Sequence, residues 1–324
     1  MRHPLRYFGA IAVCLAAVAA QAQDYPSRPV RMVVPFGPGG SSDFTARIIQ
    51  PKMIEFLGQQ VVVDNRAGAS GNVGVEIAAR APADGYTCFL GNIGTMAINP
   101  SIFPDFKVSP LRDFISVSMV VDVPGAIATH PSIPAKSLQE FVAYAKGRPG
   151  QLNYGSSGAG SAQRLAYEVF MSKAGIKLVH IPYKGGAGAA TTAVLAGEVS
   201  STMVTVASFI PHVKTGKLRV LAVVAPARVP QLPDVPTFAE SGFPELTVGS
   251  WQGMYLPAGT PKAVVNRMFK LMTQVLTDPW VIERFTLGGA IVLPSKSPQE
   301  FTGFMKEQNA LWAKTIKAIG VVGE

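Results

Sequence analysis

The chain alternates short apolar runs with turns rich in glycine and serine, and this alternation predicts strands and helices. The run Val30–Val34 is β-branched and apolar, which favours a buried strand. The turn Pro35–Gly40 ends this strand, and a helical pattern follows from Ser41. The same order returns at Leu152–Arg164, where a short strand, a Gly/Ser loop and the start of a helix follow one another. The chain therefore contains two strand–loop–helix units.

The loop of the first unit predicts an anion site. Gly39 and Gly40 carry no Cβ atom, so backbone N–H groups can approach a ligand closely. Ser41 or Ser42 can cap the helix that follows, and Pro51 should kink or end that helix. Unpaired N–H groups and the helix dipole favour negative charge at a helix N-terminus. The alternative is an ordinary strand-to-helix turn, which any α/β protein can contain.

Further segments with strand or helix periodicity complete two lobes. Strands are predicted at Gln60–Val63, Tyr86–Leu90, Phe114–Val123, Val179–Pro182, Val199–Val206 and Leu218–Val224, and helices at Leu138–Lys146, Ala189–Leu195, Lys262–Leu276 and Pro298–Ile319. Strands that alternate with helices imply parallel sheets. Crossings near Val121–Gly125 and at Gly249–Leu256 give lobe 1 residues 23–123 plus 247–324 and lobe 2 residues 124–246, facing one cleft.

The first 22 residues have the pattern of a signal peptide. A basic start is followed by the apolar run Phe8–Ala20, which is too short to span a bilayer comfortably. Ala20-Gln21-Ala22 fits a cleavage site, so we expect cleavage before Gln23 and export to the periplasm. An uncleaved anchor and a lipid on Cys14 are the alternatives. The mature chain keeps Cys88 alone, which excludes an internal disulfide and predicts a buried, inert thiol.

The charge balance argues for anions and against nucleic acid. Without Arg2 and Arg6, 27 of the 29 Lys and Arg remain against 20 Asp and Glu, a net charge of about +7. These basic residues are scattered, and aromatic residues are not interleaved with basic runs, so no nucleic-acid footprint is present. A positive field mildly favours the collection of anions.

The motifs of common enzymes are missing. No phosphate-binding loop ends in Gly-Lys-Ser/Thr, and the sequence after Gly158-Ala159-Gly160 lacks the third glycine of a dinucleotide fingerprint. Gly155–Ala159 misses the last position of a nucleophile elbow. His130, His180 and His212 stand in no local motif, and no cluster has metal-ligand spacing. We therefore expect no catalytic residue, no metal and no cofactor.

Several longer stretches carry a family resemblance. These are YPSRPVRMVVPFGPGGSSDFTAR (25–47), LGQQVVVDNRAGASGNVG (57–74), ADGYTCFLGNIGTMAINP (83–100), LNYGSSGAGSAQRLAYE (152–168), HIPYKGGAGAA (180–190) and LPDVPTFAESG (232–242). With them the mature chain resembles, end to end, the substrate-binding proteins of tripartite tricarboxylate transporters, the Bug receptors. The resemblance implies an α/β periplasmic binding protein of type II-like architecture. Each lobe is then a mostly parallel sheet flanked by helices, and the lobes close on a small carboxylate.

The resemblance also implies the site residues. The first loop maps onto 36–43, the second onto 154–161, and further cleft positions match Gly94, Thr95 and Tyr183. The predicted ligand-binding residues are Phe36, Gly39, Gly40, Ser41, Asp43, Gly94, Thr95, Tyr154, Ser156, Ser157, Gly158, Ser161, Arg164, Tyr183 and Thr205. Relatives commonly carry histidine at the positions of Arg164 and Met96, and aspartates at those of Ser200 and Val204. These departures favour an anionic ligand, with more than one carboxylate as an option.

Arg164 is the residue that most distinguishes this chain. It lies three residues after Ser161, in the first turn of the predicted helix, where its guanidinium can reach back toward a bound anion. A cation at a helix N-terminus opposes the dipole, which a bound carboxylate would compensate. The alternative is that Arg164 packs along its helix and faces solvent.

The resemblance predicts a periplasmic receptor, a monomer, that delivers its carboxylate to the membrane subunits of a tripartite tricarboxylate-type transporter. Two alternatives remain open. One is a solute sensor that presents its ligand to a signalling partner, and the other is a periplasmic enzyme on the same scaffold.

Overall fold

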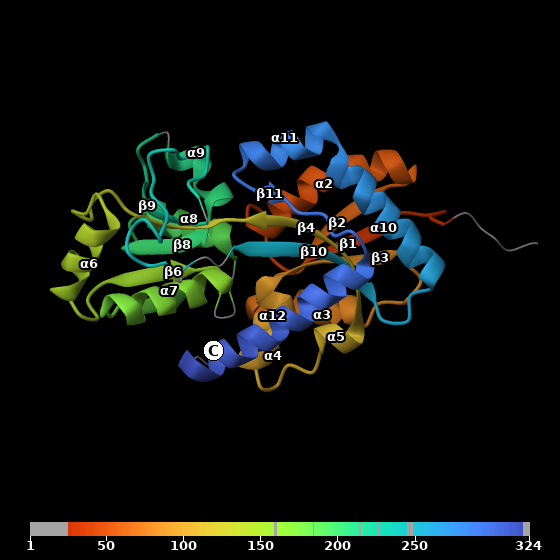
Figure 1. Cartoon of the computed structure of the whole chain (residues 1–324), viewed down its shortest axis with the longest axis horizontal. Coiled ribbons are helices and arrows are strands. Elements are labelled where there is room, and N and C mark those ends of the chain that lie inside the picture. Colours follow the sequence, from red (N-terminus) through yellow and green to blue (C-terminus); the bar gives the residue numbers. More distant parts are fainter. Residues whose placement is uncertain are drawn as a thin grey trace, which may run out of the picture.

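Two α/β lobes lie side by side, and the polypeptide crosses between them twice (Figure 1). The computed structural model describes residues 25–158, 161–183, 185–213, 215–225, 227–244, 246 and 249–319. The predicted signal peptide, residues 1–22, lies outside the described residues. We call the half built on the six-stranded sheet lobe 1 and the half built on the five-stranded sheet lobe 2.

The sheet of lobe 1 has the strand order β11-β4-β10-β3-β1-β2. Its strands are β1 (Val30–Val34), β2 (Val61–Asn65), β3 (Thr87–Asn92), β4 (Phe114–Val123), β10 (Ser250–Pro257) and β11 (Ile291–Val292). One face is covered by α2 (Ser41–Leu57), α10 (Lys262–Thr277) and α11 (Pro279–Leu287) (Figure 1). The other is covered by η1 (Ala69–Gly71), α3 (Asn72–Ala79), η2 (Gly94–Ile98), α4 (Asn99–Ile102), α5 (Pro110–Asp113) and α12 (Pro298–Ile319).

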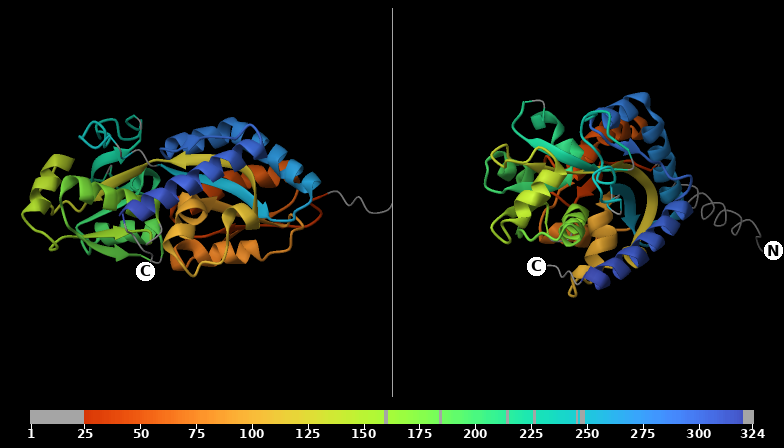
Figure 2. Two further views of the ribbon diagram at one scale, coloured as in Figure 1. Left: turned by 60° about the horizontal axis from the view of Figure 1, so that its bottom comes forward. Right: turned by 60° about the vertical axis from the view of Figure 1, so that its left-hand side comes forward.

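The sheet of lobe 2 has the order β7-β6-β8-β5-β9. Its strands are β5 (Gly125–Thr129), β6 (Asn153–Ser156), β7 (Val179–Pro182), β8 (Ser201–Thr205) and β9 (Arg219–Val224). The helices α6 (Leu138–Lys146) and α7 (Ala162–Ala174) bury one face of this sheet, and α8 (Ala187–Leu195), η3 (Val206–Ser208) and α9 (Ile210–Val213) lie on the other. Figure 2 shows the two lobes from two further sides.

The predicted two-lobed α/β fold is confirmed, but both sheets are mixed rather than mostly parallel. β1 pairs in parallel with β2 and β3, and β6 with β7 and β8. The strands next to the crossings are antiparallel to their neighbours: β10 to β3 and β4, and β5 to β8 and β9. The crossings explain the difference, because β4 leaves lobe 1 where β10 enters it, so the two strands run in opposite directions.

The first helix does not end at Pro51, one of the two outcomes expected there. α2 is 17 residues long with Pro51 inside it, and Gly58 caps its C-terminus in the left-handed conformation. Met53 and Leu57, beyond the proline, are buried in the core of lobe 1, and this burial outweighs the lost hydrogen bond. The N-cap is Gly40 and not Ser41 or Ser42, and no side chain caps this helix.

Three smaller points concern the buried cysteine, helix α11 and the question of membrane-spanning helices. Cys88 is fully buried, as predicted, and burial raises the pKa of its thiol to about 12. The sequence pattern does not predict α11, which Asp278 caps by accepting hydrogen bonds from the N–H groups of Trp280 and Val281. Within the described ranges, no helix combines the length and the apolar character that a membrane crossing requires.

Candidate functional site

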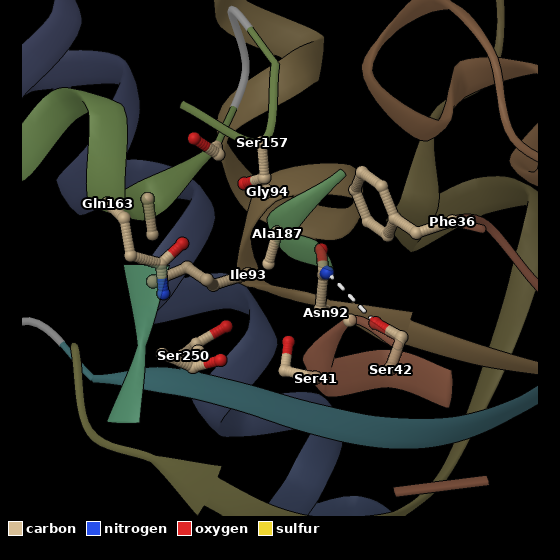
Figure 3. A pocket seen from close by; sticks show the side chains of 14 residues that line it. Phe36, Ser41, Ser42, Asn92, Ile93, Gly94, Ser157, Gln163, Ala187 and Ser250 are labelled. Carbon is tan, nitrogen blue, oxygen red and sulfur yellow. Dashed lines mark hydrogen bonds between the residues drawn. The ribbon is translucent and has the colours of Figure 1, made fainter. Parts of the chain in front are cut away.

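A pocket lies between the lobes, where the loops after β1, β3 and β6 meet (Figure 3). We call it the interlobe pocket. It is lined by Phe36, Gly40, Ser41, Ser42, Asn92, Ile93, Gly94, Ser157, Ser161, Ala162, Gln163, Ala187, Thr205 and Ser250. Its enclosed volume is about 20 Å³, whereas one water needs roughly 10–15 Å³ on the same measure. The lobes are therefore closed in this structure.

Helix N-termini from both lobes converge on the interlobe pocket. Gly40 and Ser41 begin α2, and Ala187 begins α8 behind the N-cap Gly186. No described side chain caps the N-terminus of either helix. α7 also begins at the pocket, where the hydroxyl of Ser161 accepts a hydrogen bond from the backbone N–H of Arg164 at 3.2 Å. Three helix dipoles thus present their positive ends to one small volume, which favours an anion.

Glycines let the loops of the two lobes approach each other at the backbone level. A Cβ atom at Gly188, in α8, would lie 3.2 Å from the carbonyl oxygen of Pro38. A Cβ atom at Gly37 would lie 3.4 Å from the carbonyl oxygen of Gly185, and one at Gly158 would lie 2.9 Å from the hydroxyl of Ser70. The glycine-rich loops therefore form the contact between the closed lobes as well as the pocket.

The polar side chains of the pocket are neutral. None of the described residues that line it is Asp, Glu, Lys, Arg or His. Asn92 donates a hydrogen bond from Nδ2 to the hydroxyl of Ser42 at 3.3 Å (Figure 3). Gln163 points into the pocket beside Ile93, and its buried Nε2 has no hydrogen-bond partner among the described residues (Figure 3). A buried donor without a partner is costly, so a ligand that accepts from Gln163 would gain that energy.

About half of the predicted site residues line this pocket. They are Phe36, Gly40, Ser41, Gly94, Ser157, Ser161 and Thr205. The sequence analysis missed Ser42, Asn92, Ile93, Ala162, Gln163, Ala187 and Ser250. Most of the missed residues are direct chain neighbours of predicted ones, and Ser250 begins the strand by which the chain returns to lobe 1. Proximity in the sequence could have identified these neighbours. The position of Ser250 at the pocket could not be identified in this way, because it depends on where the chain crosses back to lobe 1.

Two predicted residues of the first loop support that loop from outside the pocket. The carboxylate of Asp43 accepts a hydrogen bond from the N–H of Gly39 at 3.1 Å and forms an ion pair with Arg47 at 3.0 Å. Gly39 has a φ of 81°, which glycine adopts without strain. Thr95 is likewise hydrogen-bonded to Asn92. The backbone N–H of Asn92 donates to the hydroxyl of Thr95, and the backbone N–H of Thr95 donates to Oδ1 of Asn92.

Three predicted residues of the second loop belong to a buried polar cluster inside lobe 2. Arg164 is buried and lies 3.5 Å, Nε to Oε1, from Glu168, so it neither lines the pocket nor faces solvent. Tyr154 donates a hydrogen bond to the same carboxylate at 2.7 Å. Ser156 Oγ lies 2.7 Å from Nε2 of His180. Burial, and then the positive charge of Arg164, lowers the pKa of His180 to about 4.

The remaining predicted residues lie beside the pocket. Tyr183 is partly buried and packs on the core of lobe 2. Its ring lies 3.2 Å from the point where a Cβ atom on Gly155 would stand. Gly158 has a φ of 123° and faces Ser70 of lobe 1. In the described part of the chain, no group of three or more His, Cys, Asp or Glu side chains could hold a metal ion.

Comparison with known proteins agrees with this architecture. Residues 45–321 match the model of the tripartite tricarboxylate transporter family receptor. The BugT protein of Bordetella pertussis is 35% identical over 313 residues, which cover 96% of this chain and 95% of BugT.

Solved structures resemble the chain over nearly its whole length. The periplasmic binding protein BugD has 35% identity and a TM-score of 0.88, covering 93% of this chain and 100% of its own. Rpa4515 of R. palustris, solved with adipate, has 33% identity and a TM-score of 0.88, with coverages of 92% and 99%. MatC from Rhodopseudomonas palustris, solved with bound malate, has 30% identity and a TM-score of 0.85, with coverages of 90% and 100%.

These relatives are solute-binding receptors and not enzymes. The match spans both lobes, and it agrees with the resemblance seen in the sequence. The chain belongs to the family of tripartite tricarboxylate transporter receptors.

Proposed function

We propose that this chain is a periplasmic receptor that captures a small carboxylate in the interlobe pocket and delivers it to the membrane subunits of a tripartite tricarboxylate-type transporter. The observation that carries the proposal is the convergence of three helix N-termini on a pocket whose described lining residues carry no charge. Backbone N–H groups of α2 and α8, which lack side-chain caps, are the donors for the carboxylate. Adipate and malate in the related structures support this ligand class.

The ligand-binding residues in this proposal are those that line the pocket. Ser41, Gly40 and Ala187 supply backbone N–H groups, and Gln163 supplies a side-chain N–H that has no other partner in the described structure. Because the closed pocket is small, a dicarboxylate enters only when the lobes separate, and closure then follows hinge motion at the two crossings. The receptor acts as a monomer, since one chain contains the complete pocket.

The decisive experiment compares carboxylates with uncharged analogues of the same shape. Thermal unfolding of the mature chain is recorded with adipate, malate and other mono-, di- and tricarboxylates, and with adipamide as the neutral counterpart of adipate. A ligand that binds only the folded state stabilises it by about 2.7 kcal/mol at a concentration of 100 times its Kd. We expect at least one carboxylate, and not the diamide, to raise Tm. A panel without any shift would refute carboxylate capture.

Export and delivery are tested separately. The intact mass of protein from the periplasm should show an N-terminus at Gln23, following cleavage after Ala22. In membrane vesicles that contain the transporter subunits, uptake of the bound carboxylate should require this receptor. Binding without such uptake would favour the alternative role of a solute sensor.

A further inference from the structure

A second chamber lies between α12 and the strands that connect the lobes. Its lining residues come from β4 and β10 at the crossings, from the residues that follow β3 and β11, and from one face of α12. Figure 1 shows where these elements lie. They are Ile93, Met119, Asp122, Gly249, Trp251, Leu293, Phe304, Gln308, Leu311 and Trp312. We call it the hinge chamber. Its volume of about 310 Å³ lies at the lower end of the range typical of small-molecule sites.

Among the described residues of this lining, Asp122 alone carries a charge. Among the described residues, its buried Oδ1 has no hydrogen-bond partner, and no Lys or Arg forms an ion pair with the carboxylate. The carboxylate occupies the space beside Gly249 that a Cβ atom would fill. Burial raises the pKa of Asp122 to about 6, against the opposing effect of a backbone hydrogen bond from Val123, and a bound cation would favour the ionised form. An ionised buried carboxylate without a cation is costly.

Aromatic rings form the walls of the hinge chamber. Trp251 is the direct cross-strand neighbour of Asp122, and its ring meets that of Phe304 edge to face at 5.4 Å between centroids. Trp312 is buried and adds a second indole ring to the lining. The faces of indole and phenyl rings attract cations, and the attraction is stronger where water is excluded. The lining therefore combines one negative charge with surfaces that favour a cation.

We propose that the hinge chamber is a second ligand site, specific for a small organic cation that carries a protonated amine on an apolar body. The ammonium group pairs with the carboxylate of Asp122, and the apolar body packs against Trp251, Phe304 and Trp312. An anion is disfavoured there because Asp122 would repel it. The two sites thus differ in sign: the interlobe pocket presents helix N-termini to an anion, and the hinge chamber presents a carboxylate to a cation.

The three tryptophans of the chain make this proposal testable without knowledge of the natural ligand. Trp251 and Trp312 line the chamber, whereas Trp280 lies on α11 with 36% of its surface exposed. Benzylammonium is titrated into the mature ¹⁵N-labelled protein while the indole N–H resonances are followed, and benzyl alcohol serves as the neutral probe of similar shape. We expect benzylammonium to shift the Trp251 and Trp312 signals and to leave that of Trp280 in place.

Two variants separate the charge of Asp122 from the net charge of the protein. Asp122→Asn keeps the shape of the side chain and should weaken benzylammonium binding at least about tenfold. The matched control is Asp105→Asn, which removes one negative charge from an exposed loop and should change nothing. Benzyl alcohol should bind the wild-type protein at least about tenfold more weakly than benzylammonium.

Three outcomes overturn the proposal. The first is the absence of any indole shift with benzylammonium. The second is equal affinity for the amine and the alcohol in the wild-type protein, a comparison that needs no variant. The third is unchanged affinity in Asp122→Asn, whose fold is verified by its remaining amide resonances. The latter two would make the chamber a general apolar cavity.

Discussion

Arg164 and Glu168 compensate each other's charge inside lobe 2, four residues apart on α7. Removing one partner of a fully buried ion pair costs about 3–5 kcal/mol. Because the side chain of Glu168 is 25% exposed, we expect a smaller loss. Arg164→Met should lower the free energy of unfolding by about 2 kcal/mol. Affinity for the carboxylate should change by less than about threefold, because Arg164 does not line the interlobe pocket. Urea denaturation and calorimetric titration measure the two quantities.

The matched control is the double variant Arg164→Met with Glu168→Met, which removes both charges. It should recover part of the lost stability, since no uncompensated carboxylate remains. The opposite pattern, with strongly weakened binding and unchanged stability, would place the guanidinium on the ligand after all.

His180 gives lobe 2 a dependence on pH. Burial lowers its pKa to about 4 in the folded protein, whereas the unfolded chain has the ordinary value of 6.5. Between these values the unfolded state binds more protons, so stability rises with pH. We expect the contribution of His180 to be complete above about pH 6.5 and to be lost as the pH falls through 4. Urea denaturation of the wild type and His180→Gln should show a smaller pH dependence for the variant; equal dependences would contradict the assignment.

Some residue-scale contacts could be predicted from the sequence and others could not. The pairs Asp43–Arg47 and Arg164–Glu168 have the i,i+4 spacing of helical neighbours, so the sequence allows these ion pairs to be predicted, although our sequence analysis assigned Asp43 and Arg164 to the ligand. The contact between Ser156 and His180 depends on the register of β6 with β7, which no local pattern specifies. The sequence identified the loops of the site, but their spacing along the chain did not reveal which side chains turn away from the pocket.

At the scale of elements, the N-terminus of α2 carries the proposed carboxylate site. Ser41 lines the interlobe pocket at the first position of this helix, where no side chain caps the backbone. We expect Ser41→Glu to place a competing carboxylate there and to abolish ligand binding. The same charge should stabilise the helix by about 0.3–1 kcal/mol. Ser41→Gln has nearly the same size without the charge and should retain more of the affinity. Calorimetric titration measures the affinity of the two variants, and thermal unfolding measures their stability. An equal loss of affinity in both variants would indicate steric blockage and not charge competition.

Local pattern predicted the elements better than their arrangement. The cap of Ser137 on α6 and the extent of α12 follow the sequence signals. The mixed direction of the strands could not be predicted from local pattern, because strand direction near a crossing depends on where the chain re-enters the lobe. Pro51 shows that packing also limits such predictions. The buried side chains that follow the proline hold α2 together past a residue that ordinarily kinks or ends a helix.

At the scale of the molecule, the proposed capture of a carboxylate depends on closure, and the glycine loops determine how closely the lobes meet. Gly188 lies against the carbonyl oxygen of Pro38 and the backbone of Gly39 in the opposite lobe. The side chain of a valine there would collide with backbone atoms of the first loop, which cannot move aside as a flexible side chain can. We expect Gly188→Val to weaken carboxylate binding about tenfold or more. In small-angle X-ray scattering, saturating carboxylate should shrink the radius of gyration of the wild type but not of this variant.

The control for this prediction is Gly303→Val, because a Cβ atom at that position of α12 has no neighbour within 4 Å. Valine there should leave stability unchanged or raise it slightly, because glycine is the poorer helix former, and both affinity and closure should stay intact. If Gly188→Val still contracts with ligand and binds as the wild type does, the lobes do not close through the contact between α8 and the first loop. The interlobe pocket would then hold its ligand in a more open arrangement, and its residues would have to be reassigned from that state.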